Sequence, residues 1–473
     1  MKKILLSAGA TRTAFLSALA FACLAYWPSA ASAQCVNNDK VNVNYDEVAS
    51  NPEDFEALKT QMKNKFGLEY GLSCEGRTLY AEQEPINVPP SDPNYPKQLT
   101  LAYDRAMMRM MAKQILLKYG TQVTQRIMSV MQDDSSNPTK WDDLKNQMKS
   151  GSADVSKAEI ILDKFMNVVE GRLDVELEKL GVPAEEVRRS SVSQKKQLFK
   201  NNFRKETLQK AVGDMRGVVP VATHIFTVTR GGKQSAQLGV IAIESNNTRQ
   251  FANDISRKRE STFKGTPNSL AQILPSKKED FLNEIGLRFV YDEKGAPMLI
   301  SYGRWAVTAK SDNAARFEQY VIQAKESAFN MATTYVNEFA SSSFVVDEKQ
   351  VVESISETVA ERISEFENKK LLGQDEFVRE IEEVGLKKFK ESKSTSKMSL
   401  RGVGEIHKWE YEDPTTKILH VGAVAVWSPQ ILANQNEAVR QISSGGRAPE
   451  PKAPDSSVQE NRVSRPVNRA NDF

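Results

Sequence analysis

Two stretches of this chain repeat each other, and this repeat restricts the fold to a duplicated one. The first stretch begins at Arg216-Gly217 and ends in the apolar run Leu238–Ser245. The second begins at Arg401-Gly402 and ends in a similar run, Val421–Ser428. Each run has a glycine at its second position, 22 residues after the first glycine in one copy and 20 in the other. We therefore expect two copies of one structural unit.

A second pair of matches lies upstream of each stretch. Phe66-Gly67-Leu68 corresponds to Ile285-Gly286-Leu287, and Gly76 corresponds to Gly295, at a constant offset of 219 residues. The two copies share packing residues but no pair of reactive residues. A duplication of this kind favours scaffolding or binding over catalysis.

The elements that the sequence predicts occur in the same order in both copies: a hairpin, a long helix, a helical insert and a second hairpin. Alternating and continuous apolar runs predict the strands, and apolar residues at helical spacing predict the helices. The fold class expected is α+β, with two tandem copies of a small antiparallel or mixed sheet, each packed by a long helix. The predicted units are a signal peptide (1–33), module 1 (34–250, insert 132–212), a linker (251–273), module 2 (274–435, insert 345–395) and a disordered tail (436–473).

The long helices are predicted at about 99–131 and from Asp312, as N-cap, to about residue 340. Ala324, Ala328 and Ala332 are spaced four residues apart, so they share one face of the second helix. Small residues in such a row let a helix lie close to a sheet. The apolar runs that close each copy predict central strands covered on both faces.

The first 33 residues have the three parts of an export signal. Lys2, Lys3 and Arg12 supply the positive charge, residues 14–26 are almost wholly apolar, and Ala31-Ser32-Ala33 is a small-residue cleavage pattern. No later stretch is long and apolar enough to predict a transmembrane segment. We expect a periplasmic protein, with association with the outer membrane left open.

The number of cysteines and the net charge indicate the compartment and the kinds of partner that the protein can have. Removal of the signal would discard Cys23, which follows a poor lipobox, and leave Cys35 and Cys74, which we expect to form a disulfide in an oxidising compartment. Unpaired cysteines and a metal site are weaker alternatives. The net charge of +3 resides in the signal, because the rest of the chain carries 61 basic and 61 acidic residues. This balance argues against nucleic acid as a partner.

Residues 297–428 resemble a periplasmic module, that of flagellar assembly protein T and of related small outer-membrane lipoproteins. The resemblance rests on Tyr302-Gly303-Arg304, on the three alanines spaced by four, on the strand ending at Trp409 and on the final apolar strand to Ser428. It covers about a third of the chain. It implies a part that associates with further copies or with an envelope machine, and it implies no enzyme activity.

Residues with reactive or metal-binding side chains give weak signals. His407 and His420 lie in the closing hairpin of copy two and would need a third ligand to hold zinc. The run Met107–Met111 offers thioethers suited to Cu(I), although flexible packing is favoured because Arg109 and Lys113 would repel a cation. No GxSxG arrangement supports a serine hydrolase. No metal, cofactor or catalytic residue is therefore predicted.

Arg216 and Arg401 are the candidate contact residues, because both copies place Arg-Gly before the same strand. A structural role is favoured, in which a bulge glycine follows an arginine that pairs with a helix carboxylate. The alternative is a repeated contact point for a partner or an anionic glycan.

The sequence thus predicts a non-enzymatic, exported assembly protein that acts by protein–protein contacts or self-association, with the inserts and tail as contact surfaces. A ring or an envelope secretion or motility machine is the setting that the resemblance implies. A periplasmic ligand- or metal-binding protein is the alternative, and a hydrolase is less favoured. A hydrolase would need converging acids or a Ser-His pair in a pocket.

Overall fold

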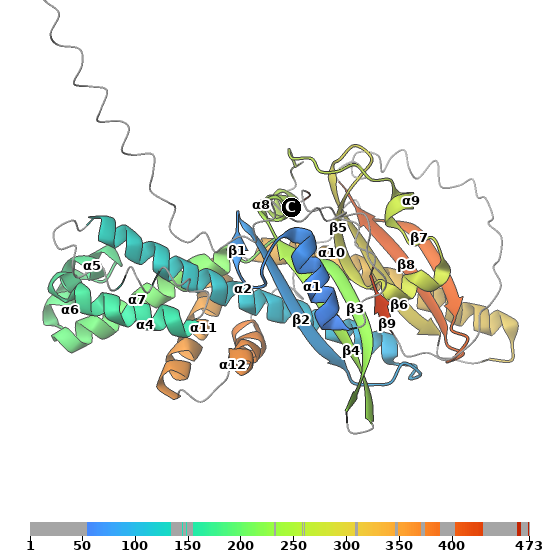
Figure 1. Ribbon diagram of the computed structural model, residues 1–473, viewed down its shortest axis with the longest axis horizontal. Helices are drawn as coiled ribbons and strands as arrows, with labels where there is room; N and C mark the ends of the chain where they lie inside the picture. Colours follow the sequence, from blue (N-terminus) through green and yellow to red (C-terminus); the bar gives the residue numbers. More distant parts are fainter. Residues whose placement is uncertain are drawn as a thin grey trace, which may run out of the picture.

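Two antiparallel sheets lie side by side, with a group of helices projecting beyond the first sheet (Figure 1). The computed structural model of the chain describes residues 54–133, 155–230, 233–307, 311–345, 349–369, 374–387 and 403–428, except Lys258 and Glu260, together with Leu144, Met148, 461–464 and Asp472. The predicted signal peptide, Cys35 and Arg401 lie outside these residues. The fold is α+β with two tandem sheet units, as the repeats predict.

The two sheets have the same strand order. The first contains β1 (Ser73–Cys74), β2 (Arg77–Ile86), β3 (Val219–Arg230), β4 (Lys233–Glu244) and β9 (Asn461–Val463), in the order β1-β2-β4-β3-β9. The second contains β5 (Gly286–Tyr291), β6 (Pro297–Val307), β7 (Val403–Glu412) and β8 (Leu419–Trp427), in the order β5-β6-β8-β7. In each copy the last strand of the closing hairpin therefore inserts beside the opening hairpin, and β9 is an addition to the first sheet.

Local irregularities also recur at matching positions. The pairing of β3 with β4 shifts between Pro220 and Ala222, and the pairing of β7 with β8 shifts between Glu405 and His407. The extra residues are Val221 and Ile406, and each lies four positions after the glycine of its Arg-Gly pair. Gly67 and Gly286, which match in sequence, both have positive φ, 63° and 77°. Bulges and left-handed glycines at equivalent sites are what a duplicated unit retains.

A long helix crosses one face of each sheet: α2 (Tyr95–Asp133) in the first copy and α10 (Ala314–Val345) in the second. The predicted alanine face of α10 is buried against the sheet. At Gly303 of β6 the approach is so close that an added Cβ would lie 1.9 Å from the carbonyl oxygen of Ala328. The alanine row and the glycine together set the distance between helix and strand.

Helices cover both faces of the first sheet. Leu238, Val240 and Ala242 of β4 pack with α2, and Ile241 and Ile243 pack on the opposite face with α1 (Phe55–Phe66). In the second sheet the face opposite α10 packs with η2 (Lys278–Asn283) and α9 (Leu270–Ile273). The continuous apolar runs of β4 and β8 follow from burial on both faces, as predicted.

The two helical inserts form one body, which we call the helical lobe. Its first part is α4 (Val155–Val168), η1 (Glu170–Arg172), α5 (Leu173–Lys179), α6 (Ala184–Arg189) and α7 (Val192–Gly213). Its second part is α11 (Lys349–Lys369), α12 (Gln374–Glu380) and the π-helical turn η3 (Ile381–Gly385). Phe199 and Phe203 of the first insert share a core with Val359 and Ile363 of the second and with the later turns of α2. The two inserts therefore pack into one domain-like unit and do not form separate additions to their own modules.

The modules share a second core between the sheets. The predicted linker, residues 251–273, begins within α8 (Asn246–Ser256), a helix that is capped by a reciprocal hydrogen-bonding pair, Ser245 and Thr248. Phe251 of α8 lies 5.2 Å from Phe289 and 5.6 Å from Trp427, measured between ring centroids. The linker prediction is wrong for these residues, because the helix buries its apolar face against module 2.

Two smaller predictions also differ from the structure. Helix α10 begins at Ala314 and its N-cap is Asn313, whose Oδ1 accepts a hydrogen bond from Arg316 N (3.1 Å), so Asp312 is not the cap. The predicted disordered tail contains β9, which pairs with β3. Among the described residues no helix combines the length and apolar character needed to cross a bilayer.

Candidate functional site

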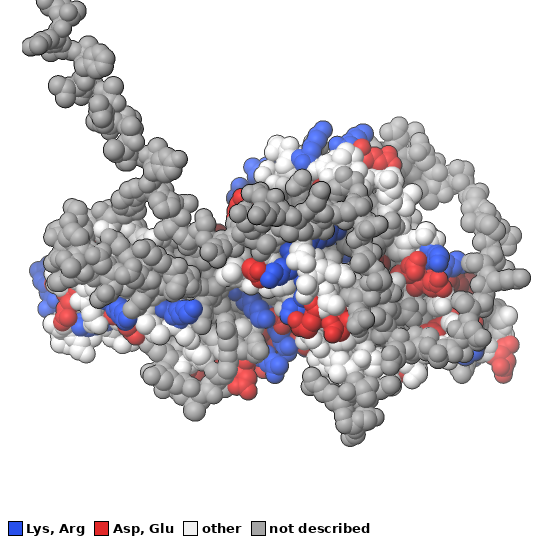
Figure 2. Space-filling view, viewed as in Figure 1, with Lys and Arg blue, Asp and Glu red and all other residues white. Residues whose placement is uncertain are grey.

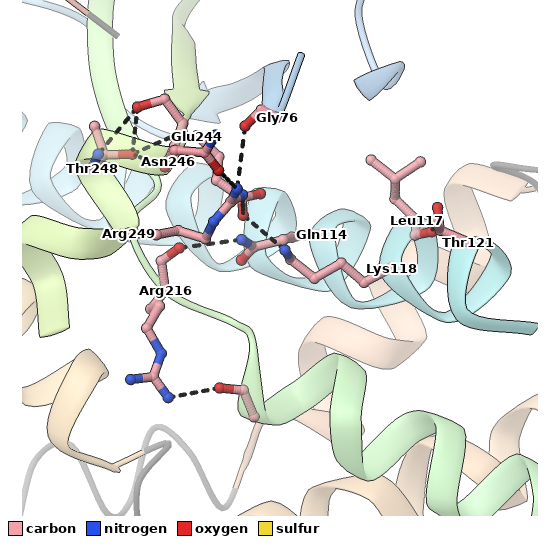
Figure 3. A network of polar contacts seen from close by, with 12 residues as sticks. Gly76, Gln114, Leu117, Lys118, Thr121, Arg216, Glu244, Asn246, Thr248 and Arg249 are labelled. Carbon is pink, nitrogen blue, oxygen red and sulfur yellow. Dashed lines mark hydrogen bonds and ion pairs between the residues drawn. The ribbon is translucent and has the colours of Figure 1, made fainter. Parts of the chain in front are cut away.

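The carboxylate of Glu244, at the end of β4, is the centre of a buried polar network (Figure 3). Lys118 Nζ of α2 lies 2.8 Å from its Oε1, and Arg249 Nη1 of α8 lies 2.5 Å from the same oxygen. The hydroxyl of Tyr80, on β2, donates to Oε2 at 3.0 Å. Arg249 also donates to the carbonyl of Gly76 in the first hairpin (3.3 Å). The network joins both hairpins of copy one to α2 and α8.

The two cations decide the protonation state of this carboxylate. Burial alone would raise the pKa of Glu244, but Lys118 and Arg249 outweigh it and hold the pKa below its ordinary value. Burial, and then the neighbouring carboxylate, raise the pKa of Tyr80 well above its ordinary value. Glu244 is therefore ionised and Tyr80 neutral at physiological pH, so the carboxylate forms ion pairs with both cations and accepts from the hydroxyl.

A second network joins the first sheet to the helical lobe. Glu84 of β2 forms ion pairs with Arg105 (3.3 Å between Nε and Oε2) and with Arg109, both on α2. Arg109 also lies 4.0 Å from Glu382 of η3, in the insert of the other copy. Burial raises the pKa of Glu84, and the arginines offset this only in part. Arg109 thus connects sheet one with a turn contributed by module 2.

A third network lies inside the helical lobe. Glu159 of α4 accepts hydrogen bonds from Arg204 of α7 and from the hydroxyl of Tyr119 of α2. Lys200 Nζ lies 3.7 Å from Glu159 and 2.6 Å from Asp163. Glu159 and Arg204 are both buried, so removal of one would leave the other as an uncompensated charge.

The three networks have one arrangement in common. In each, a buried carboxylate on one element is neutralised by cations from a different element. Charges of both signs are also interspersed over the part of the visible surface that the structure describes (Figure 2). The described residues contain no group of three or more His, Cys, Asp or Glu side chains placed to hold a metal ion. The three networks therefore fasten separate elements to one another.

Arg216, a predicted contact residue, turns inward. Its guanidinium donates to the carbonyl of Gly213 at 2.7 Å and to the side chain of Asn253 in α8, and its own carbonyl accepts from Gln114 (3.4 Å). The contact with α8 is thus made to an amide, and the pairing with a helix carboxylate stays a prediction. Gly217 after it has the positive φ, 80°, that its place before the strand requires. Arg401 lies outside the described residues.

The two histidines of copy two are not brought together. His407 pairs with Val424 and His420 pairs with Tyr411, so they lie four residues apart along the hairpin, about 13 Å. His407 stacks on Phe281 with ring centroids 5.0 Å apart, and burial and then Lys278 lower its pKa. His420 is buried. This separation is too large for one metal ion to bind both side chains.

The methionine run divides between two cores. Met108 and Met111 pack in the helical lobe, and Met110 packs between α2 and the first sheet. Packing is thus the role that the structure gives these three side chains. Cys74 is buried at the first hairpin, and its predicted disulfide partner, Cys35, lies outside the described residues.

Little in the sequence predicts the Glu244 network. Its one signal is a carboxylate that closes an otherwise apolar run, at the position where copy two has Trp427. Arg249 is close in the chain, but the partners at positions 80 and 118 are far from Glu244, and no spacing rule connects them with it.

Comparisons with known proteins find a family model of unknown function that matches part of the chain. Residues 158–257 match the domain of unknown function DUF6844, a segment that runs from α4 to the end of α8 and includes Glu159, Arg204 and Glu244. No curated protein matches the chain. The crystal structure of a hypothetical protein from Francisella tularensis is similar at 17% identity and a TM-score of 0.47, covering 82% of this chain and 94% of that one.

Proposed function

We propose that this chain is an exported structural protein of a bacterial cell envelope, which acts through contacts with other proteins or with further copies of itself. One observation carries the proposal: the buried carboxylates Glu84, Glu159 and Glu244 are each ion-paired to cations of another element. The chain thus uses its buried charges to hold a composite body together. A protein whose task is to present a fixed surface needs this rigidity.

The helical lobe is the proposed contact surface. It projects beyond the sheets (Figure 1), and three of its helices each present a large apolar side chain about half exposed to solvent: Ile160 (52%), Val175 (48%) and Val192 (54%). Aliphatic side chains on a surface otherwise rich in charge are suited to the centre of a protein interface. The export-signal pattern and the resemblance to ring-forming envelope modules support a periplasmic setting for this assembly.

The proposal is tested on the chain from residue 34 onward, purified from periplasm, by light scattering and by chemical crosslinking before lysis. We expect an oligomer or a defined crosslinked partner. Ile160→Asp should weaken that association, whereas Lys157→Asp, an exposed position on the same helix, should not. A monomer that yields no crosslinked species would contradict the proposal.

A further inference from the structure

The C-terminal segment adds a strand to the first sheet. Val463, Arg462 and Asn461 pair antiparallel with His224, Ile225 and Phe226 of β3. Ser464 continues the pairing: its N–H donates to the carbonyl of Thr223 at 2.8 Å, and its Oγ accepts from the N–H of Thr223 at 2.6 Å. The hydrogen bonds of this short strand with β3 therefore use backbone groups of β3.

The strand lies where the two modules meet. Beyond β3, it also contacts η2 of module 2. Further along the segment, Asp472 accepts a hydrogen bond from the N–H of Thr266, at 3.0 Å, and its carbonyl accepts from the hydroxyl of Tyr291 on β5, at 2.5 Å. Ser464 and Asp472 are both buried. The described residues of the segment thus contact β3 and η2, through β9 and Ser464, and Thr266 and Tyr291, through Asp472.

The link between this segment and its own module is long. In the sequence, 32 residues separate Ser428, at the end of β8, from Asn461. A chain of that length extends to roughly 110 Å when fully stretched. A connection of this length does not restrict the strand to the β3 edge of its own copy.

We propose that the edge of β3, beside η2, accepts residues 461–464 of a second copy, so that neighbouring copies exchange C-terminal strands. Strand addition relies on backbone hydrogen bonds, which are the same whichever copy supplies the strand. The strand makes the same contacts with β3 whether it comes from its own copy or from a neighbour. Close packing of copies therefore determines which of the two forms is populated. This inference rests on the proposed function and names the element through which copies join.

The register suggests a direct test. Ser464 and Thr223 form a hydrogen-bonded pair, so His224 and Val463, one residue on, form a non-hydrogen-bonded pair with Cα atoms about 4.5 Å apart. That separation suits a disulfide. One chain carries His224→Cys and another carries Val463→Cys. The two are co-expressed and also mixed at high concentration, then oxidised and separated on a non-reducing gel.

Strand exchange predicts a covalent heterodimer of the two single-substituted chains. Each of them mixed with the unsubstituted chain provides the background from the native cysteines. Ser464→Pro, placed in the Val463→Cys chain, removes a donor to β3 and should abolish the heterodimer. Asn461→Pro is the matched control, because the N–H at that position points away from β3 and its loss leaves the pairing intact.

The contrary result is also defined. A chain with both substitutions that closes its own disulfide, while the mixed chains give no heterodimer, would overturn strand exchange. If His224→Cys does not fold, the pair Phe226→Cys and Asn461→Cys repeats the test in the same register, with Ser464→Pro again as the disrupting change. If light scattering shows an oligomer but this heterodimer does not form, strand exchange is wrong and the proposed function still stands. If light scattering shows only a monomer, the proposed function itself is contradicted.

Discussion

Glu244 shows how one residue replaces many packing contacts at the end of a strand. Copy two fills the equivalent position with Trp427, which packs against Phe251 in the core between the sheets. Copy one instead places a carboxylate there and surrounds it with Lys118, Arg249 and Tyr80. The two copies thus solve the same packing problem by different chemistry, which is why comparison of the repeats did not identify the site.

We predict that Glu244→Gln lowers the free energy of unfolding by about 2 kcal/mol, because Lys118 and Arg249 lose a charged acceptor that is almost wholly buried. Urea unfolding measures the change. Glu75→Gln is the control: Glu75 pairs with Arg77 at 3.3 Å, but its side chain is 76% exposed, so its loss should cost less than about 0.5 kcal/mol. Equal effects of the two substitutions would contradict the account.

The stabilisation from Glu244 should depend on pH in a defined direction. The folded-state pKa is lowered from 4.5, so the carboxylate favours the folded state fully above that value and progressively less as pH falls through the lower folded-state pKa. The difference in unfolding free energy between the native chain and Glu244→Gln should be constant near neutral pH and shrink below about pH 4.5. A difference that does not change on acidification would show that the charge is not its source.

For helices and strands, patterns of residues close together in the sequence predicted several elements correctly. An element whose apolar face packs on a distant part of the chain was not predicted. The spacing of the alanines located the packing face of α10. Gly295, in the turn between β5 and β6, has a positive φ of 75°. Helix α8 was missed, although Ser245 and Thr248 form a capping pair and Phe251 and Ile255 are at helical spacing. The polar residues between these signals suggested a linker, and the partner of its apolar face lies in module 2.

Gly303 tests the closeness of helix and strand. We predict that Gly303→Ala destabilises the protein by about 3 kcal/mol, since the added methyl group meets the backbone of α10, which cannot move without displacing the whole helix. Gly213→Ala is the matched control: nothing lies within 4 Å of the added Cβ, and alanine favours the helix that ends there. Thermal unfolding of both variants measures the effect. A Gly303→Ala protein as stable as the native one would show that the contact is looser than described.

At the scale of the whole molecule, the duplication was evident from the repeats but the way the copies combine was not. The strand orders β1-β2-β4-β3 and β5-β6-β8-β7 confirm a repeated unit. The repeats carry no information on which surface each insert buries, because amphipathic helices pack equally well on any apolar partner of suitable shape. The inserts pack on each other, and Arg109 and Glu382 bridge them to the first sheet. The pairing of inserts from different copies makes the two modules one body.

Hydrogen exchange of the native protein tests whether the helical lobe, built from both inserts, unfolds as a single cooperative unit. Val359→Asp places a charge from α11 in the shared core, so amides of α4 and α7, in the other insert, should lose protection together with those of α11. Glu361→Ala, at an exposed position of the same helix, should leave protection unchanged. Loss of protection confined to α11 and α12 would contradict the account.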